Sequence, residues 1–392
     1  MRKKFLDTAI SFEPFSALYD AGATPDQVEE AIVALLQPYV PDQAALRRLA
    51  ISALATDAIC VGVLSSRGDW KAMLDRCFDI RNRAVATDKK LTFEALAFFQ
   101  RGILSAQASY TKLVLFEVPK NELTLDEFAF ELIRTIGFLI ESNLKPYIKE
   151  LYCLSVIASG RSIDLNEILT EDFGKTCEKF KQEMIEESFL APAPWGVRIN
   201  QWRNVAQHNS YEVIGDSIVA SYGRSQPQKQ VILSRTELLT VARELVQRVG
   251  ALKCSREITI LNHIDELESY LPIQEPTEYG HATALFASLA TQGFRLRDLQ
   301  VNVGQVIAFV EDLAPSEGYS RPIHCSQFVG TVASRFPGAA VEVRYFVNDV
   351  HVWKFSATAV DLDRVMNLSD PLSELAHAVA SVRMSSLRSD PA

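Results

Sequence analysis

Cysteine is scarce in this sequence, and no two cysteines lie close together in it. Six cysteines occur in 392 residues, with no CxxC motif and no dense framework. They are Cys60, Cys77, Cys153, Cys177, Cys254 and Cys325. Such spacing excludes a small disulfide-stapled fold and indicates reduced, mostly buried thiols. Cys254 and His263 lie nine residues apart on one predicted helix, and His324 and Cys325 point their donors in different directions, so we expect no metal or other cofactor.

Long apolar runs and phosphate-binding glycine motifs are also missing. No uninterrupted apolar stretch approaches membrane-spanning length, and the basic start Met1-Arg2-Lys3-Lys4-Phe5 is not followed by the apolar core of a signal peptide. We therefore expect a cytoplasmic protein with no membrane partner. The glycines form neither a P-loop nor a dinucleotide-binding fingerprint, so nucleotide-driven chemistry has no motif here.

The chain has no overall excess of positive charge. Its net charge is −9 and its pI is about 5.3, so general electrostatic adhesion to nucleic acid or anionic lipid is not expected. A hydrophobic content of 48% over 392 residues is enough to bury the cores of two or three domains.

Helical patterning dominates the first 270 residues. Thr24-Pro25-Asp26 is a helix start with proline at the first helical position. Apolar residues at i, i+4 and i+7 predict a helix from Trp70 to Val85, in which we interpret Arg81-Asn82-Arg83 as a solvated face. Thr92 opens a further helix that runs towards Leu115. These segments predict an N-terminal helical domain over residues 1–120.

A second helical domain is predicted over residues 121–270. It begins at the capping sequence Thr124-Leu125-Asp126-Glu127, and Pro146 is expected to break or kink its first helix. Further helices are predicted at 175–187 and 195–208. The period then changes to strands, with a hairpin over Tyr211–Ala220 around Gly215-Asp216. The remaining predictions are a short strand at 231–233 and a long helix at 235–271, interrupted near Cys254.

The last third of the sequence predicts a small α+β domain over residues 271–392. Helices are expected at 281–291 and 326–336, strands at 294–311, and a hairpin formed by 340–345 and 351–357. The hairpin turn is Asn348-Asp349.

The stretch from Gln201 to His208 contains the residues that are best suited to catalysis. Only six histidines occur in the chain, and none precedes His208. Histidine exchanges a proton near neutral pH, and arginine is a permanent cation whose planar fork suits a phosphate. Arg203 and His208 together therefore supply what RNA cleavage needs without a metal. On a regular helix, residues five apart differ by roughly 140° around the axis, whereas Asn204 and His208 share a face.

The charge around this segment differs from that of the whole chain. Between Trp195 and Arg256 there are nine basic and four acidic residues, a local charge of +5 in a chain of −9. The basic residues are Arg198, Arg203, Arg224, Lys229, Arg235, Arg243, Arg248, Lys253 and Arg256. A basic region of this kind is typical of a polyanion-binding surface.

An arginine followed by asparagine, with a histidine five positions after the arginine at a helix end, resembles the R-x4–6-H motif of the HEPN superfamily (higher eukaryotes and prokaryotes nucleotide-binding). The hairpin from Tyr211 to Gly223 resembles one carried by some bacterial members. The resemblance covers roughly residues 121–270. It implies a mainly α fold: a HEPN-like helical bundle with a small β-hairpin, preceded by a helical domain and followed by the small α+β domain.

The resemblance also implies a function and roles for residues. Many HEPN proteins are metal-independent endoribonucleases with a composite site at a homodimer interface, and they occur as toxins or anti-phage defence effectors. His208 would act as general base or acid, Arg203 would bind the scissile phosphate, and Asn204 would orient either. Four further residues are expected to bind RNA phosphates: Arg198, Gln207, Arg224 and Lys229. The implied partners are RNA, including tRNA, a second copy of the chain, and an antitoxin or defence-system protein.

Other interpretations of the same residues stay open. His208 also fits a helix C-terminal histidine favoured by the helix dipole, with Arg203 in an ordinary surface ion pair. A catalytically inactive HEPN scaffold tolerates Arg203 and His208 when they are buried or paired with acids. A regulatory module that binds a nucleotide signal predicts a pocket away from His208, lined by residues such as Arg224, Lys229 or Arg235.

Overall fold

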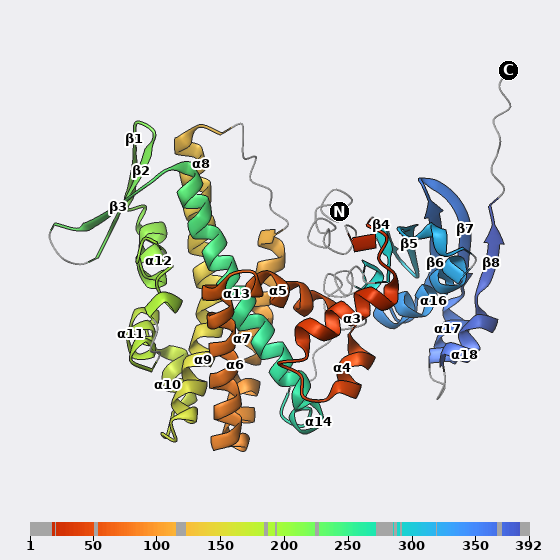
Figure 1. Ribbon diagram of the computed structural model, residues 1–392, viewed down its shortest axis with the longest axis horizontal. Coiled ribbons are helices and arrows are strands. Elements are labelled where there is room, and N and C mark those ends of the chain that lie inside the picture. Colours follow the sequence, from red (N-terminus) through yellow and green to blue (C-terminus); the bar gives the residue numbers. More distant parts are fainter. Residues whose placement is uncertain are drawn as a thin grey trace. The chain divides into compact units, whose positions relative to one another are not determined.

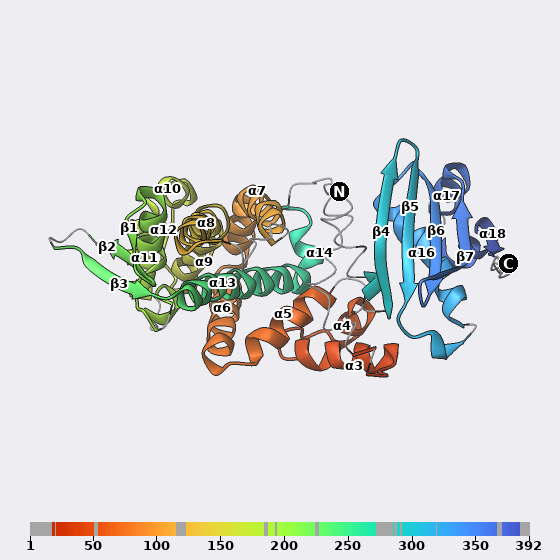
Figure 2. The same ribbon diagram turned by 90° about the horizontal axis from the view of Figure 1, so that it is seen from above.

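The computed structural model in Figures 1 and 2 describes most of the chain. The described residues are 18–19, 21–50, 54–114, 123–183, 187–192, 194–223, 227–271, 285, 288–290, 292–318, 320–366 and 371–384. They are mostly helical and form two small sheets, in agreement with the mainly α class expected from the sequence. Within these ranges, no helix has the length and apolar character required to cross a membrane.

The chain divides into two compact units. One comprises the described residues of 39–41 and 60–273, and the other those of 1–38, 42–59 and 274–392. This division differs from the three consecutive domains expected at 1–120, 121–270 and 271–392. The helices after residue 60 belong with residues 121–270, because they pack against the helices of that region.

The first unit is a helical bundle with one small sheet (Figure 1). Its helices are α6 (Gly68–Thr87), α7 (Lys89–Val114), α8 (Leu125–Phe138), the π-helix η1 (Leu139–Leu144), α9 (Lys145–Ala158), α10 (Leu165–Thr170), α11 (Phe173–Glu183), the 3-10 helix η2 (Glu187–Phe189), α12 (Ile199–His208), α13 (Arg235–Asn262) and α14 (Ile264–Leu267). Helix α5 (Ala55–Ser65) spans the boundary between the units. The core forms where α6 and α7 pack on α9, and α13 on α6, α8 and α9.

Several helix ends follow from the local sequence. Thr124 caps α8 through a complete capping box with Glu127, as expected. The helix that starts at α8 is interrupted before Pro146, as expected, although the chain stays helical: the π-helix η1 covers residues 139–144, and α9 begins at Lys145 with Pro146 in its first turn. Helix α13 continues through Cys254 and ends at Asn262, so the expected interruption at Cys254 is wrong.

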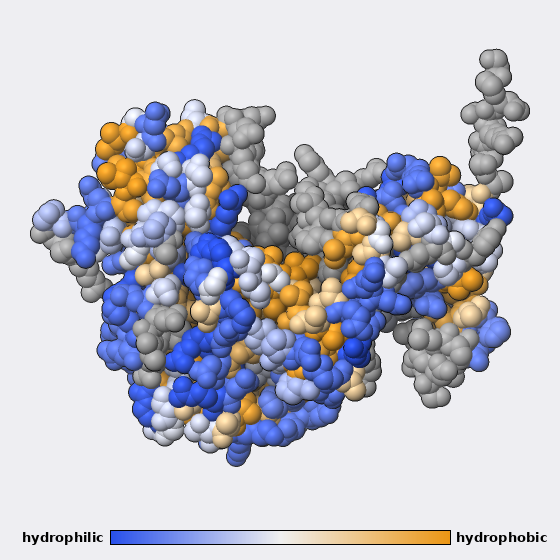
Figure 3. All heavy atoms as spheres, in the orientation of Figure 1, coloured by the Kyte–Doolittle hydropathy of each residue, from blue (hydrophilic) through white to orange (hydrophobic). Residues whose placement is uncertain are grey.

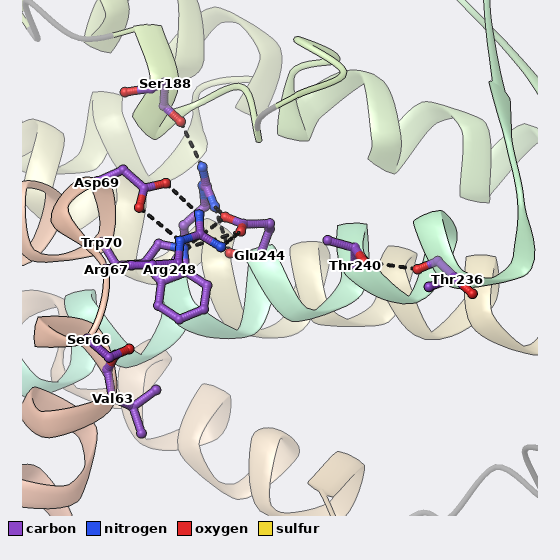
Figure 4. A network of polar contacts seen from close by, with 10 residues as sticks. All are labelled: Val63, Ser66, Arg67, Asp69, Trp70, Ser188, Thr236, Thr240, Glu244 and Arg248. Carbon is purple, nitrogen blue, oxygen red and sulfur yellow. Dashed lines mark hydrogen bonds and ion pairs between the residues drawn. The ribbon is translucent and has the colours of Figure 1, made fainter.

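Buried charges connect the core helices. Arg81 and Arg256 both pair with Glu150, at 2.8 and 2.7 Å, and all three side chains are almost fully buried. The interpretation of Arg81 as part of a solvated face is therefore wrong, because α6 turns this residue into the bundle towards α9 and α13. A second network joins α6 to α13 through Glu244, which accepts hydrogen bonds from Arg67 and Arg248 (Figure 4).

The small sheet follows α12 and is antiparallel, in the order β1 (Tyr211–Ile214), β2 (Ser217–Tyr222), β3 (Lys229–Leu233). The predicted hairpin around Gly215 is confirmed, with Gly215 in the left-handed region (φ 59°) that this turn requires. The predicted strand at 231–233 is confirmed as part of β3.

The second unit contains a five-stranded sheet in the order β4-β5-β6-β7-β8. Its elements are α3 (Pro25–Leu36), α4 (Gln43–Leu49), β4 (Phe294–Asn302), β5 (Gln305–Asp312), the 3-10 helix η3 (Pro315–Glu317), α16 (Ser320–Arg335), β6 (Ala340–Val347), β7 (Val350–Ala357), α17 (Ala359–Met366), α18 (Pro371–Ala378) and β8 (Ala380–Arg383). Strands β5 and β6 are parallel and are connected through α16, which packs on β5, β6 and β7 (Figure 2).

The α+β prediction for the C-terminal third is confirmed in its main features. The Asn348-Asp349 hairpin is present, with both residues at positive φ, and α16 begins six residues before the expected start at Ser326. Of the helix expected at 281–291, only residues 285 and 288–290 are described, and they are helical. A buried ion pair between Asp312 and Arg321 at 2.8 Å ties the end of β5 to α16.

Candidate active site at the end of helix α12

Helix α12 positions the predicted motif. It begins at Ile199 rather than at Trp195, and it ends at His208 because Asn209 adopts the left-handed conformation (φ 48°, ψ 42°). Asparagine tolerates this conformation better than most residues, and it often ends a helix in this way. His208 is therefore the last helical residue, next to the turn into β1.

The opposite side of α12 anchors it to the bundle. Ile199, Trp202 and Val205 are buried in the bundle core. Ala206 lies directly against Gly137 of α8, where a Cβ would come within 2.6 Å of the Ala206 Cβ. This close contact fixes α12 on α8 and leaves the remaining side of α12 open.

Arg203 is held by a carboxylate from the π-helix η1. Its Nε donates to Oε2 of Glu141 at 2.6 Å, and the two side chains are 20% and 35% exposed. Burial acts to raise the pKa of the Glu141 carboxyl, but the hydrogen bonds and charges of Lys145 and Arg203 outweigh it and lower that pKa. Nη1 and Nη2 of Arg203 have no hydrogen-bond partner in the described part of the chain. The guanidinium is thus fixed at one nitrogen, while the two that form a fork remain available.

The other motif residues lie on the open side of α12. Asn204, Gln207 and His208 are all exposed, and none has a hydrogen-bond or ion-pair partner among the described residues. Because α12 is a regular α-helix as far as His208, Arg203 and His208 are roughly 140° apart around its axis and about 7.5 Å apart along it. One chain therefore does not bring the two side chains onto the same phosphate.

The other expected phosphate-binding residues differ in their surroundings. Arg198 precedes α12 and is paired with Glu178 and, at 3.1 Å, with Glu187. Lys229, at the start of β3, is exposed and has no partner among the described residues. Arg224 lies outside the described residues.

Most of the basic window is neutralised by acids within the bundle. Arg248 pairs with Glu244 and Arg256 with Glu150, both buried, and Lys253 pairs with Glu257. Arg235, named for the alternative nucleotide pocket, donates to the carbonyl of Leu123 and lies 4.4 Å from the ring centre of Phe128. The sequence count of +5 therefore does not correspond to a continuous basic surface, because the pairing acids come partly from outside the window.

Sequence reasoning missed Glu141 and Lys145. Glu141 lies 62 residues before Arg203, so only the fold brings them together. The one local signal was the i, i+4 spacing of Glu141 and Lys145, which is common on solvated helices.

Comparisons with known proteins add no relative. No protein-family model, curated protein or solved structure matches this chain. In the part of the chain that the structure describes, no group of three or more histidine, cysteine, aspartate or glutamate side chains is arranged to hold a metal ion.

Proposed function

We propose that this protein is a metal-independent endoribonuclease of the HEPN type, with a composite active site formed by two copies of the chain. The observation that carries the proposal is the state of α12. Among the described residues, His208 has no partner and is exposed at the helix end, and Arg203 is fixed through Nε while its Nη1 and Nη2 have no partner. An accessible proton-transfer group and a positioned cation are what 2′-hydroxyl attack on a phosphate requires.

The helix geometry supports a site shared between two copies. A two-fold axis beside α12 would set Arg203 of one copy near His208 of the other, because such an axis presents the same patch twice. The neighbouring helix α8 exposes two large apolar side chains, Phe130 (49% exposed) and Phe138 (43%). Figure 3 shows apolar side chains gathered over the α8 and β1–β2 region of this unit. An apolar surface beside an incomplete site is suited to contact with a second copy.

In the proposed mechanism, His208 and Arg203 have different roles in one reaction step. His208 removes the proton of the 2′-hydroxyl, whose oxygen attacks the adjacent phosphorus and displaces the 5′-oxygen of the next nucleotide. That leaving oxygen takes up a proton, either from the protonated His208 of one of the two copies or from water, and becomes the 5′-hydroxyl. Arg203 stabilises the charge that develops on the phosphorane oxygens, and Asn204 orients His208 or the phosphate. The products are a 2′,3′-cyclic phosphate and a 5′-hydroxyl. The proposed partners are RNA and a second copy of the chain, and a role as a toxin or defence effector follows from the resemblance alone.

The ion pair of Arg203 favours a second candidate. If Glu141 serves only to neutralise Arg203, the motif has a structural role and the chain is a catalytically inactive HEPN scaffold for protein assembly. The two candidates differ in whether the free Nη atoms of Arg203 contact a phosphate.

The deciding experiment is RNA cleavage in EDTA by the purified protein, beside His208→Ala and Arg203→Ala. Matched controls are His377→Ala, an exposed histidine in the last turn of α18, and Arg134→Ala, an exposed arginine of α8 paired with Glu131. We expect cyclic-phosphate ends with wild type and both controls, and loss of cleavage in both motif variants.

Two other outcomes have defined meanings. Absence of cleavage on total RNA and tRNA by a protein that forms dimers would favour the scaffold. Equal cleavage by wild type and both motif variants would reject the assignment of the site to α12.

A further inference from the structure

The register of the small sheet places two further side chains beside the end of α12. The backbone N–H of Ser221 donates to the carbonyl of Ser210 at 2.8 Å, which continues the β1–β2 pairing by one residue towards α12. The next residue of β2, Tyr222, therefore lies at the level of Asn209, next to His208. Tyr222 is in turn the register partner of Lys229 on β3. Figure 1 shows the three strands lying beside the end of α12 from which β1 continues.

Tyr222 and Lys229 project on the side of the sheet that faces the helices. Side chains alternate along a strand, so Tyr222 shares a face with Ala220 and Ile218. Both of these residues are fully buried, and β2 contacts α12. Lys229 is on the same face because residues opposite one another in a register project together. The two side chains thus lie at the end of the sheet that is next to the C-terminal end of α12, where His208 is the last helical residue.

Both side chains are available to a ligand. Tyr222 is partly exposed, Lys229 is exposed, and neither has a hydrogen-bond, ring or ion-pair partner in the described ranges. The acids of the hairpin are elsewhere: Glu212 projects from the other face, and Asp216 is in the turn at the far end of β1 and β2. Neither acid of the hairpin therefore neutralises Lys229.

We propose that Tyr222 and Lys229 form a nucleotide-binding subsite next to His208, and that this subsite selects unpaired RNA. The proposal rests on the proposed ribonuclease function and specifies its substrate class. The Tyr222 ring stacks on a base that has left its neighbours, and Lys229 binds the phosphate of the same or the next nucleotide. Bases in a duplex are already stacked on one another, so they cannot use the ring. Duplex RNA keeps only the phosphate contact and binds more weakly.

Binding of uncleavable RNA tests the subsite without depending on cleavage. The probe is a fluorescent 2′-O-methyl oligonucleotide of about eight nucleotides, measured by anisotropy as a single strand and as a duplex in EDTA. We expect wild type to prefer the single strand, and Tyr222→Ala to weaken its binding about tenfold while leaving duplex binding unchanged. Tyr222→Phe keeps the ring and should bind as wild type. Lys229→Gln should weaken the binding of both the single strand and the duplex, and it should reduce the slope of log affinity against log salt by about 0.7.

The neighbouring residue on β3 supplies the matched control. Gln230 is exposed one position after Lys229 and projects from the opposite face, so Gln230→Ala should change neither probe. Equal affinity of wild type for single strand and duplex, or unchanged binding by Tyr222→Ala, would overturn the subsite even if the protein cleaves RNA. Selective single-strand binding that depends on Tyr222 in a protein that cleaves no RNA would retain the subsite and reject the ribonuclease function.

Discussion

Gly137 of α8 and Ala206 of α12 are in such close contact that a Cβ on residue 137 would lie 2.6 Å from the Ala206 Cβ. Carbon atoms of two side chains do not approach to this distance, so glycine at position 137 permits the spacing of the two helices. The contact lies three residues along α12 from Arg203 and two from His208. The position of the whole motif therefore depends on a residue that has no side chain.

Gly137→Ala is expected to destabilise the helical unit, although alanine is the better helix former. The helix preference contributes about 0.5–1 kcal/mol in favour of alanine, whereas overpacking a well-packed contact costs about 1–3 kcal/mol. We expect a net loss of about 1 kcal/mol in the free energy of unfolding, measured by urea denaturation. The rate of RNA cleavage should fall by more than the loss of folded protein explains, because α12 is displaced.

A double variant separates steric from general effects. Gly137→Ala combined with Ala206→Gly restores the space, so the two changes should be non-additive and recover part of the loss. Gly102→Ala in α7 is the matched control, because its Cβ would meet only Pro146 at an ordinary 3.9 Å. That variant should gain about 0.5–1 kcal/mol. Additive effects of Gly137→Ala and Ala206→Gly would contradict the steric explanation.

Glu141→Gln is expected to lower RNA cleavage about tenfold while changing the free energy of unfolding by less than about 1 kcal/mol. The ion pair with Arg203 is partly exposed and screened by solvent, so it adds little stability. Its role is to fix the guanidinium through Nε, and loss of that orientation misplaces the phosphate. Initial rates over a range of RNA concentrations separate kcat from KM. Glu131→Gln, which disrupts the pair of Glu131 with Arg134, is the control. Faster cleavage by Glu141→Gln would mean that Glu141 restrains Arg203 instead of positioning it.

Local sequence signals predicted most of the secondary structure. The capping sequence at Thr124, the hairpin around Gly215 and the turn at Asn348-Asp349 are short-range features, and each is present. Predictions that depended on a single residue were weaker. Pro146 coincides with an interruption by a π-helix and not with the end of the helical segment, and α13 passes Cys254, where its neighbours Ala251, Leu252 and Ile258 are all buried core residues.

Partners distant in sequence were not predictable in the same way. The sequence showed that Arg203 and Asn204 precede His208 on one helix, but Glu141 reaches Arg203 only through the packing of η1 on α12. Arg81 looked like a solvated residue because its partner, Glu150, is 69 positions away. Net charge in a sequence window likewise counts residues without their partners, so it does not describe a surface.

Glu150→Gln is expected to destabilise the helical unit by about 3–5 kcal/mol, because it leaves Arg81 and Arg256 as buried cations without an anion. Urea denaturation followed by circular dichroism measures the loss. Glu131→Gln, which affects only an exposed pair on α8, should change stability by less than about 0.5 kcal/mol. A small effect of Glu150→Gln would indicate that water reaches the two arginines. That result would contradict the almost complete burial of these side chains.

The second unit is expected to lose stability as the pH falls below about 6.5, in part through His324. Burial, together with the charge of Arg321, lowers the pKa of His324 below its ordinary value, although Asp312 acts in the opposite direction. As the pH falls, the unfolded chain therefore takes up a proton at His324 before the folded chain does. The contribution of His324 is complete above its unfolded pKa of about 6.5 and is lost as the pH falls through the lower, folded-state pKa.

His324→Phe tests this expectation, because phenylalanine keeps the ring contacts with Phe294 and Phe328 but does not titrate. It also removes the 2.6 Å hydrogen bond between His324 and Gln292, so the variant should be less stable than wild type at pH 7.5. Native-state hydrogen exchange of the α16 amides at pH 7.5 and 5.5 gives the stability of this unit. On acidification wild type loses the contribution of His324 to stability, whereas the variant has no such contribution to lose. The difference in the free energy of unfolding between wild type and variant should therefore be smaller at pH 5.5 than at pH 7.5. An unchanged difference would mean that His324 is protonated equally in the folded and unfolded chains, in which case burial would not lower its pKa.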